Sequence, residues 1–169
     1  MYALVAELGL RTFRTYNDAG ELLVDLGGSQ SRMRPTKGAV PRLGPFALAD
    51  LAQGLWRFGR LARQVDLDSP WATKGAPRLD GQTFESWIRL NLRTPTGRAY
   101  FRTATEAVFA ADSADISLLH ALFYAHANGD LESLVAVDQG AQQDRVVGGS
   151  VLIAQRLAEG VDIRLGTPV

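Results

Sequence analysis

The stretch that decides the fold is VDQGAQQDRVVGGSVLIAQRLAEG, residues 137–160. Its polar first half contains three glycines, Gly140, Gly148 and Gly149, and the helical pattern SVLIAQRLAE follows directly. Glycines before a helix can cradle a phosphate, but a Walker loop needs a lysine after its last glycine and a dinucleotide fingerprint needs G-x-G-x-x-G. The stretch has neither, because Gly148 and Gly149 are followed by serine and valine. We therefore expect these glycines to make a tight turn that places the helix.

The composition is that of a soluble globular chain. Its 169 residues are 46% apolar and 21% charged, enough for one domain with a core. Eighteen basic residues balance 18 acidic ones, which gives no reason to expect a nucleic-acid or membrane-surface partner. The absence of cysteine excludes disulfides, thiolate metal sites and a cysteine nucleophile. With no apolar run long enough for a bilayer and no basic leader, we expect a cytoplasmic protein.

The spacing of apolar residues predicts mostly helices. Over residues 46–65 they recur every three or four positions, which is typical of an amphipathic helix with one buried face. A second helix is expected after Asp80 or Thr83, with Phe84, Trp87 and Ile88 buried. The remaining helices are expected over residues 95–111 after Thr94, over 115–129, and over 150–159 with Ser150 as N-cap. Residues 131–137 suit a strand or a turn of helix.

Strand signals lie near both ends of the chain. A short helix should end at Gly9, where glycine takes the left-handed conformation easily. RTFRTY and ELLVDL, residues 11–16 and 21–26, flank the turn residues NDAG and predict a β-hairpin. Residues 29–45 should form a loop, and VDIRLGTPV, residues 161–169, a strand. The predicted class is α+β, mostly helical.

The sequence presents no acid–base, nucleophile or metal set, and we assign no catalytic residue and no metal ligand. His120 and His126 lie six positions apart and so face different sides of a helix, whereas neighbouring metal ligands are spaced by three or four. Ser150 follows Gly-Gly and does not fit the G-x-S-x-G elbow. The carboxylates considered for acid–base work, all expected on solvated faces, are Glu106, Asp112, Asp115 and Asp138.

Four segments, taken in order, resemble the flavin-containing amine oxidases, the family of monoamine oxidase and putrescine oxidase. They are AELGLRTFRTYNDAGELLVDLGG, SPWATKGAPRLDGQTFESWI, TPTGRAYFRTATEAVFAADSADISLLHALFY and GAQQDRVVGGSVLIAQRLAEGVDIRLGTPV. The resemblance covers nearly the whole chain. GAQQDRVVGGS, together with LGP at residues 43–45, is most similar to bacterial members of the putrescine oxidase type.

The resemblance implies that residues 1–169 are part of a substrate-binding domain. Residues 1–45 would supply the hairpin and loop, 46–136 the helices of the cavity, and 137–169 a glycine-rich link, helix and strand leading toward the FAD domain. The family's Rossmann-type G-x-G-x-x-G segment, its aromatic pair beside the flavin and its lysine have no counterpart in this sequence. We therefore expect a central fragment that binds no FAD and is inactive alone.

The expected partners are an amine substrate and the remainder of the enzyme, which carries the FAD domain. In isolation, the hairpin and the last strand would lack sheet partners and leave apolar surface exposed. This predicts marginal stability, a homodimer or other self-association.

The family oxidises the C–N bond of an amine, and the resemblance implies a primary amine or polyamine similar to putrescine. The flavin takes the hydride equivalent, the imine hydrolyses to the aldehyde, and oxygen reoxidises the flavin with release of peroxide. By resemblance, Gln142 helps to position the substrate, and the backbone of Pro168 and Val169 contacts FAD. The cavity-lining positions are Tyr100, Thr103, Ala104, Ala107, Val108, Leu134 and Val135. Several of them carry small side chains, which predicts a wider cavity or a longer amine.

Alternative interpretations remain open. Another flavoprotein of the same superfamily, of the desaturase or protoporphyrinogen oxidase type, also uses Gly-Gly before such a helix, although GAQQDR argues against it. A non-catalytic helical interaction module on this scaffold is the third hypothesis. Plain helix packing accounts equally well for Ala104 and Ala107.

Overall fold

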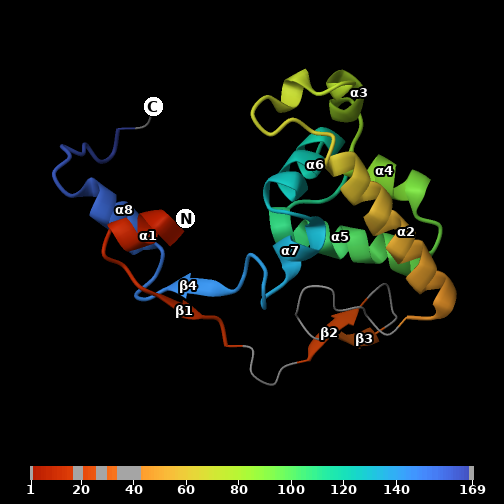
Figure 1. Ribbon diagram of the computed structural model, residues 1–169, viewed down its shortest axis with the longest axis horizontal. Coiled ribbons are helices and arrows are strands. Elements are labelled where there is room, and N and C mark those ends of the chain that lie inside the picture. Colours follow the sequence, from red (N-terminus) through yellow and green to blue (C-terminus); the bar gives the residue numbers. More distant parts are fainter. Residues whose placement is uncertain (1, 17–20, 26–29, 34–42, 168–169) are drawn as a thin grey trace. The chain divides into compact units, whose positions relative to one another are not determined.

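The computed structural model describes residues 2–16, 21–25, 30–33 and 43–167, and these residues form two compact units (Figure 1). One unit spans residues 17–141, and the other joins residues 1–16 to residues 142–169. Within the described residues, no helix combines the length and the apolar character needed to cross a membrane.

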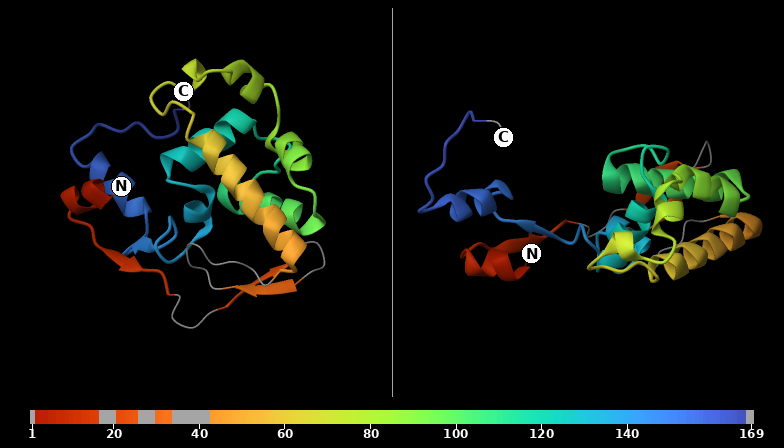
Figure 2. Two further views of the ribbon diagram at one scale, coloured as in Figure 1. Left: turned by 45° about the vertical axis from the view of Figure 1, so that its right-hand side comes forward. Right: turned by 90° about the horizontal axis from the view of Figure 1, so that it is seen from above.

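The larger unit is mostly helical. After two strands, β2 (Leu22–Asp25) and β3 (Gln30–Met33), its helical elements in chain order are α2 (Pro45–Ala62), the 3₁₀ turn η1 (Pro70–Ala72), α3 (Ala76–Asp80), α4 (Phe84–Asn91), α5 (Pro95–Phe109), α6 (Leu118–Ala127) and α7 (Leu131–Val135). The apolar helix α6 packs against α2, α3, α4 and α7, while α5 packs against α2, α4 and α7. In the left view of Figure 2, α2 runs diagonally in front of other helices of this unit, and in the right view it lies along one side of them. The helices expected from the sequence are confirmed, and residues 131–135 are helix rather than strand.

Aromatic side chains form the centre of the core. Phe58 of α2 stacks on Phe84 of α4 with ring centroids 5.0 Å apart, and it meets Trp87 and Phe101 edge-on. Full burial of each such ring contributes about 1.5–3 kcal/mol. The predicted buried side of α4, which is Phe84, Trp87 and Ile88, is confirmed. The core therefore fixes α2, α4 and α5 against one another.

Side chains cap the helices of this unit where the sequence offers them. Thr83 accepts a hydrogen bond from the Ser86 backbone N–H, and Thr94 accepts one from that of Gly97. Each bond satisfies one of the backbone donors that a helix N-terminus leaves without a partner. Both caps, and the position of Pro95 in the first turn, agree with the sequence prediction.

The predicted hairpin between residues 11–16 and 21–26 is wrong. Strand β2 (Leu22–Asp25) instead pairs antiparallel with β3 (Gln30–Met33), which lies in the segment expected to be a loop. The sequence carries two turn signals, NDAG before β2 and Gly27-Gly28 after it, and either can close a hairpin. The structure pairs β2 across the second signal.

The smaller unit contains α1 (Tyr2–Glu7), β1 (Thr12–Arg14), β4 (Asp144–Val146) and α8 (Val151–Ala158). Strands β1 and β4 pair antiparallel, with Thr12 opposite Val146. The hydroxyl of Tyr2 donates to Asp144 at 2.6 Å, which ties α1 to β4. The end of α1 agrees with the predicted stop at Gly9, whose φ is 68°.

The Gly-Gly pair makes the turn that leads into α8. Gly148 and Gly149 have φ of 84° and 99°, values that favour glycine, so the predicted turn is confirmed. A Cβ on Gly148 would lie only 2.7 Å from the Cδ1 atom of Leu152. The predicted capping by Ser150 is wrong. Its φ of −66° and ψ of −19° are helical, whereas a capping hydroxyl requires extended backbone, and it makes no capping hydrogen bond.

The C-terminal strand expected over residues 161–169 does not form in the described residues 161–167, which adopt bends, turns and irregular backbone. The apolar alternation of VDIRL is present in the sequence, but a strand also needs a hydrogen-bonded partner, and the described residues provide none to this segment.

Candidate functional site

Helices α5 and α7 carry most of the positions expected to line a substrate cavity, and the two helices pack against each other. Thr103 and Ala107 of α5 are exposed, and Tyr100, Val108 and Val135 are partly buried. Ala104 and Leu134 are buried in this chain and contribute to packing. The structure thus brings these positions onto neighbouring helices and leaves the small side chains of Thr103 and Ala107 accessible.

The rotation of α5 separates two sides of the helix. At about 100° per residue, Tyr100, Thr103 and Ala107 turn to one side. Phe101 and Thr105 are fully buried in the core. We call the side with Tyr100, Thr103 and Ala107 the outer side of α5.

Tyr100 is the principal polar group on that side. Burial, together with the nearby negative charge of Glu132, raises the pKa of its phenol to about 12. The hydroxyl therefore stays protonated at neutral pH and can donate a hydrogen bond. The outer side of α5 can bind and orient a ligand, but the structure assigns no acid–base pair to it.

Asp50 of α2 holds the N-terminus of α5. Asp50 is 8% exposed, and its carboxylate accepts hydrogen bonds from the backbone N–H of Thr94 at 2.7 Å and of Arg93 at 3.0 Å, and from the Thr94 hydroxyl at 2.7 Å. Burial alone would raise the pKa of Asp50, but the hydrogen bonds from Thr94 and Arg93 outweigh it and lower the pKa. Gly97 fits closely here, since a Cβ would lie 2.9 Å from the Asp50 Oδ2 atom.

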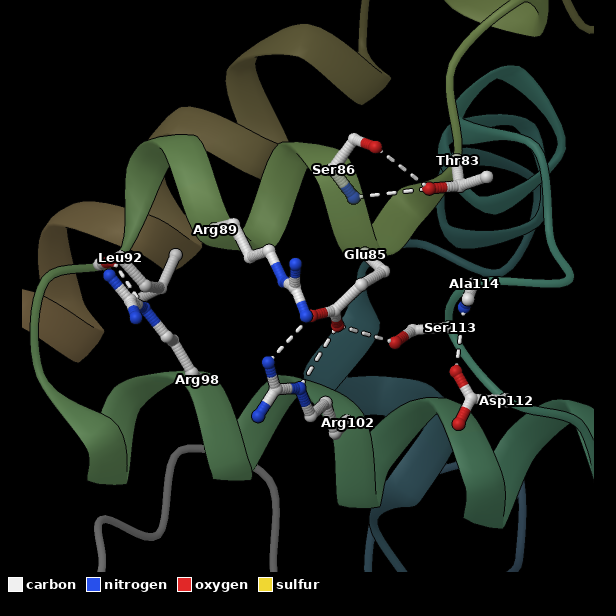
Figure 3. Close-up of polar contacts among 10 residues, drawn as sticks. All are labelled: Thr83, Glu85, Ser86, Arg89, Leu92, Arg98, Arg102, Asp112, Ser113 and Ala114. Atoms are coloured by element: carbon white, nitrogen blue, oxygen red, sulfur yellow. Dashed lines mark hydrogen bonds and ion pairs between the residues drawn. The ribbon is translucent and has the colours of Figure 1, made fainter.

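Glu85 of α4 holds the middle of α5, as Figure 3 shows. Arg102 donates to both carboxylate oxygens, from Nη2 at 2.6 Å and from Nε at 2.9 Å. The Ser113 hydroxyl donates at 2.8 Å and Arg89 Nε at 2.7 Å. These donors, Arg102 first, lower the pKa of Glu85 to about 2 against the opposing effect of burial. The carboxylate is therefore ionised at neutral pH.

Neither Asp50 nor Glu85 was predicted from the sequence. Asp50 stands among apolar residues of α2, and Glu85 stands four positions before Arg89, as a solvated surface pair would. Only the Thr94-Pro95 cap signal pointed to the segment that Asp50 contacts. The partners Thr94 and Arg102 are far from these carboxylates in sequence, so no local spacing reveals the contacts.

Gln142 lies in the smaller unit, where it is exposed. Its backbone carbonyl accepts a hydrogen bond from the Thr15 hydroxyl at 2.8 Å, which supports the β1–β4 pair. Its assignment to the substrate therefore stays a prediction. Pro168 and Val169, the positions expected to contact FAD, lie outside the described residues.

The histidines take part in packing. His126 Nδ1 lies 3.0 Å from the Val65 carbonyl oxygen. His120 lies beside the rings of Phe109 and Tyr124, at 5.7 and 6.2 Å between centroids. The part of the chain that the structure describes contains no group of three or more His, Cys, Asp or Glu residues able to hold a metal ion.

Two open hollows lie elsewhere on the larger unit, and neither is lined by the predicted cavity positions. The first, about 510 Å³, is lined by Phe46, Ala49, Asp50, Gln53, Arg57, Leu90, Asn91, Arg93 and Thr94. The second, about 470 Å³, is lined by Leu67, Asp68, Pro70, Trp71, Asp80, Leu119, His120 and Phe123.

Known proteins resemble this chain over nearly its whole length. No family model matches the sequence. The putative flavin-containing monoamine oxidase AofH of Mycobacterium tuberculosis is 35% identical over 163 residues, which are 96% of this chain and 35% of that protein. The flavin-containing amine oxidase A of Canis lupus familiaris is 28% identical over 170 residues. The match covers 98% of this chain and 31% of the canine protein.

Solved structures of amine oxidases share the fold. A triple mutant of putrescine oxidase with redesigned cofactor binding matches this chain at a TM-score of 0.83 and 25% identity. The match covers 99% of this chain and 37% of the putrescine oxidase chain. Cyclohexylamine oxidase from Brevibacterium oxydans matches this chain at a TM-score of 0.80 and 25% identity. The match covers 95% of this chain and 35% of the cyclohexylamine oxidase chain. The chain spans about a third of the length of these relatives. The resemblance read from the sequence is confirmed: this chain is a homologue of the flavin-containing amine oxidases and shares their fold over the third of their length that it matches.

Proposed function

We propose that this chain forms the substrate-binding part of an FAD-dependent amine oxidase that converts a primary amine or a polyamine similar to putrescine to an imine, with release of peroxide. The observation that carries the proposal is the 35% identity to a putative monoamine oxidase over 96% of this chain. The match to putrescine oxidase, at a TM-score of 0.83, supports an amine as the substrate. Each relative named above is an amine oxidase, which favours this reaction over that of a desaturase or a protoporphyrinogen oxidase.

In this proposal, FAD held by the complete enzyme would supply the two-electron oxidation, and this chain would bind and orient the amine. The outer side of α5 supplies the groups for the substrate. The protonated Tyr100 hydroxyl can donate to an uncharged amine nitrogen, and Thr103 and Ala107 leave room beside it.

The test is oxidation of amines by the complete enzyme that contains this chain, purified with FAD. We expect putrescine or cyclohexylamine to bleach the oxidised flavin absorbance under anaerobic conditions and to release peroxide in air. A flavin that stays oxidised with every amine would contradict the proposal. Flavin reduction by a polyene or a porphyrinogen would support the other flavoprotein classes instead, and a complete protein without flavin would support the interaction module.

The expectation that the chain alone binds no FAD has its own test. Residues 1–169 are purified in the presence of FAD and freed of unbound cofactor by gel filtration. We expect no flavin absorbance to co-elute with the protein. Retention of one flavin for each chain would show that this part of the enzyme holds the cofactor by itself.

A further inference from the structure

We infer that Glu85 is a positioning residue for the substrate: by holding Arg102, it fixes the rotation of α5 and with it the outer side that is proposed to bind the amine. This inference rests on the proposed function of that side. Glu85 lies on α4 and holds α5 from the side of Arg102, so its effect on the substrate is transmitted through α5.

Arg102 lies on a different face of α5 from the outer side, and its direction is about 100° from that of Thr103. At about 100° per residue, Arg102 points about 140° away from Ala107 and about 160° away from Tyr100. A rotation of α5 about its axis would therefore displace Arg102 and the outer side together. A restraint on Arg102 consequently sets where Tyr100 and Ala107 stand, without occupying the space that a substrate needs.

Glu85 is itself held firmly. The helix that carries it begins at the Thr83 cap and buries Phe84 and Trp87 in the core. The backbone N–H of Glu85 donates to the Ser113 carbonyl oxygen at 2.9 Å, and the Ser113 hydroxyl donates back to the Glu85 carboxylate at 2.8 Å. These bonds join Glu85 to the segment directly after α5. The carboxylate is thus oriented independently of Arg102.

The pairing between Glu85 and Arg102 is geometrically specific. Two N–H groups of the guanidinium meet the two oxygens of one carboxylate, at 2.6 and 2.9 Å. Such a bidentate pair fixes direction as well as distance. The Glu85 side chain is 13% exposed and the Arg102 side chain 40%, so water screens the pair less than a pair with both side chains fully exposed. Asp50 fixes the N-terminus of α5, and Glu85 fixes its middle.

The experiment compares three variants of the complete flavin enzyme, each assayed for amine oxidation well below its unfolding temperature. Glu85→Gln removes the ion pair, and Arg102→Lys keeps the charge but loses the two-pronged geometry. Arg89→Gln is the matched control, because Arg89 contacts the same carboxylate from α4 itself, one helical turn away. We expect Glu85→Gln to raise the KM for the amine about tenfold, with kcat within about twofold of wild type. Arg102→Lys should fall in between, and Arg89→Gln should leave KM unchanged.

The outcomes separate the inference from the proposed function. If the wild-type enzyme oxidises no amine, the proposed function fails and the inference falls with it. If the wild type is active and Glu85→Gln lowers only the melting temperature, with KM unchanged, the role of Glu85 is structural and the inference is overturned. Should Glu85→Gln not fold, Arg102→Gln removes the same ion pair from its more exposed partner and is judged by the same KM criterion. In that case a KM equal to wild type overturns the inference.

Discussion

Asp50 shows how a carboxylate among apolar residues can belong to the architecture of a fold. A buried charge without partners would be strongly destabilising, but Asp50 accepts from Arg93, from Thr94 and from the side chain of Gln53. Its charge is matched by donors that would otherwise lack partners at the start of α5. These hydrogen bonds therefore hold the Asp50 carboxylate in place, and its role is to position the start of α5.

The substitution Asp50→Asn should destabilise the chain. An asparagine at this position would keep the shape of the side chain but lose the charge, and its amide group would face N–H donors. We expect the free energy of unfolding to fall by about 2 kcal/mol in urea denaturation followed by tryptophan fluorescence. The matched control is Asp112→Asn, an exposed carboxylate that accepts from the Ala114 N–H, with an expected loss below about 0.5 kcal/mol. Equal losses for the two variants would contradict the role of Asp50.

Glu85 makes the stability of the chain depend on pH in the acid range. Its folded-state pKa is about 2, below the usual 4.5, so the folded protein favours the ionised form. The stabilisation is fully present above pH 4.5 and is lost as the pH falls from there toward about 2. After a discount for the partial exposure of Arg102, it amounts to about 2 kcal/mol.

The measurement is the difference in free energy of unfolding between wild type and Glu85→Gln, taken across the acid range. We expect the difference to be constant near neutral pH and to shrink as the pH falls below 4.5. A difference independent of pH would show that packing, and not the charge of Glu85, stabilises this position.

At the scale of elements, two glycines of α2 predict opposite effects of the same substitution. A Cβ on Gly54 would lie 2.8 Å from Leu92 Cδ1 and 3.3 Å from the Phe101 ring, in the packed core. Gly59 has only the end of Arg63 within reach, at 3.5 Å. We expect Gly54→Ala to cost about 1–2 kcal/mol in the free energy of unfolding, because overpacking outweighs the helix propensity of alanine. Gly59→Ala should stabilise by about 0.5–1 kcal/mol. The same sign for both in thermal or urea denaturation would refute this account of the packing between α2 and α5.

In the proposed function the outer side of α5 lines the substrate cavity, so the size of its side chains should limit the size of the amine that fits. Ala107 is exposed and small, so Ala107→Leu adds volume to that side without disturbing the buried face. We expect the complete enzyme with this change to lose about tenfold in kcat/KM for a long or bulky amine and to change little for a short one. Glu106→Gln, also on the exposed surface of α5, serves as the control. A uniform loss for amines of every length would indicate disturbance of the fold and not a narrower cavity.

The elements that the sequence predicts well are those with local signals. Thr94 followed by Pro95 marks the start of α5, and the structure begins the helix there. Strand β1 has no such signal for its partner, because Thr12 pairs with Val146, far along the chain. Ser150 shows a further limit, since the residue type suits a cap but its backbone is helical.

In the candidate site, too, some features were predicted from the sequence and others depend on contacts between distant residues. Resemblance to a family assigned positions on α5 and α7, and the structure packs these two helices together. The residues that hold α5 in place were not predicted. Asp50 lies 44 positions from Thr94, and Glu85 lies 17 from Arg102, so their contacts depend on tertiary packing that no window of sequence contains.

At the scale of the whole molecule, the two units differ in how much apolar surface they bury. Helix α6 of the larger unit buries Leu118, Leu122 and their neighbours, whereas α8 of the smaller unit has no buried residue. Exposed apolar side chains continue from α8 into the segment after it: Val151, Leu157, Val161, Ile163 and Leu165. A run of this kind is typical of a surface that another part of a protein covers.

We therefore expect residues 1–169, purified alone, to self-associate through α8 and the segment after it. The weight-average mass in sedimentation should rise with protein concentration, because pairing removes the exposed apolar side chains from water. The double variant Leu157→Lys with Ile163→Lys should shift the chain toward the monomer. Leu90→Lys is the matched control, since Leu90 is also exposed but lies on α4 of the larger unit, and it should leave the mass unchanged. A chain that stays monomeric at every concentration, or one that Leu90→Lys dissociates equally well, would refute α8 and its neighbours as the associating surface.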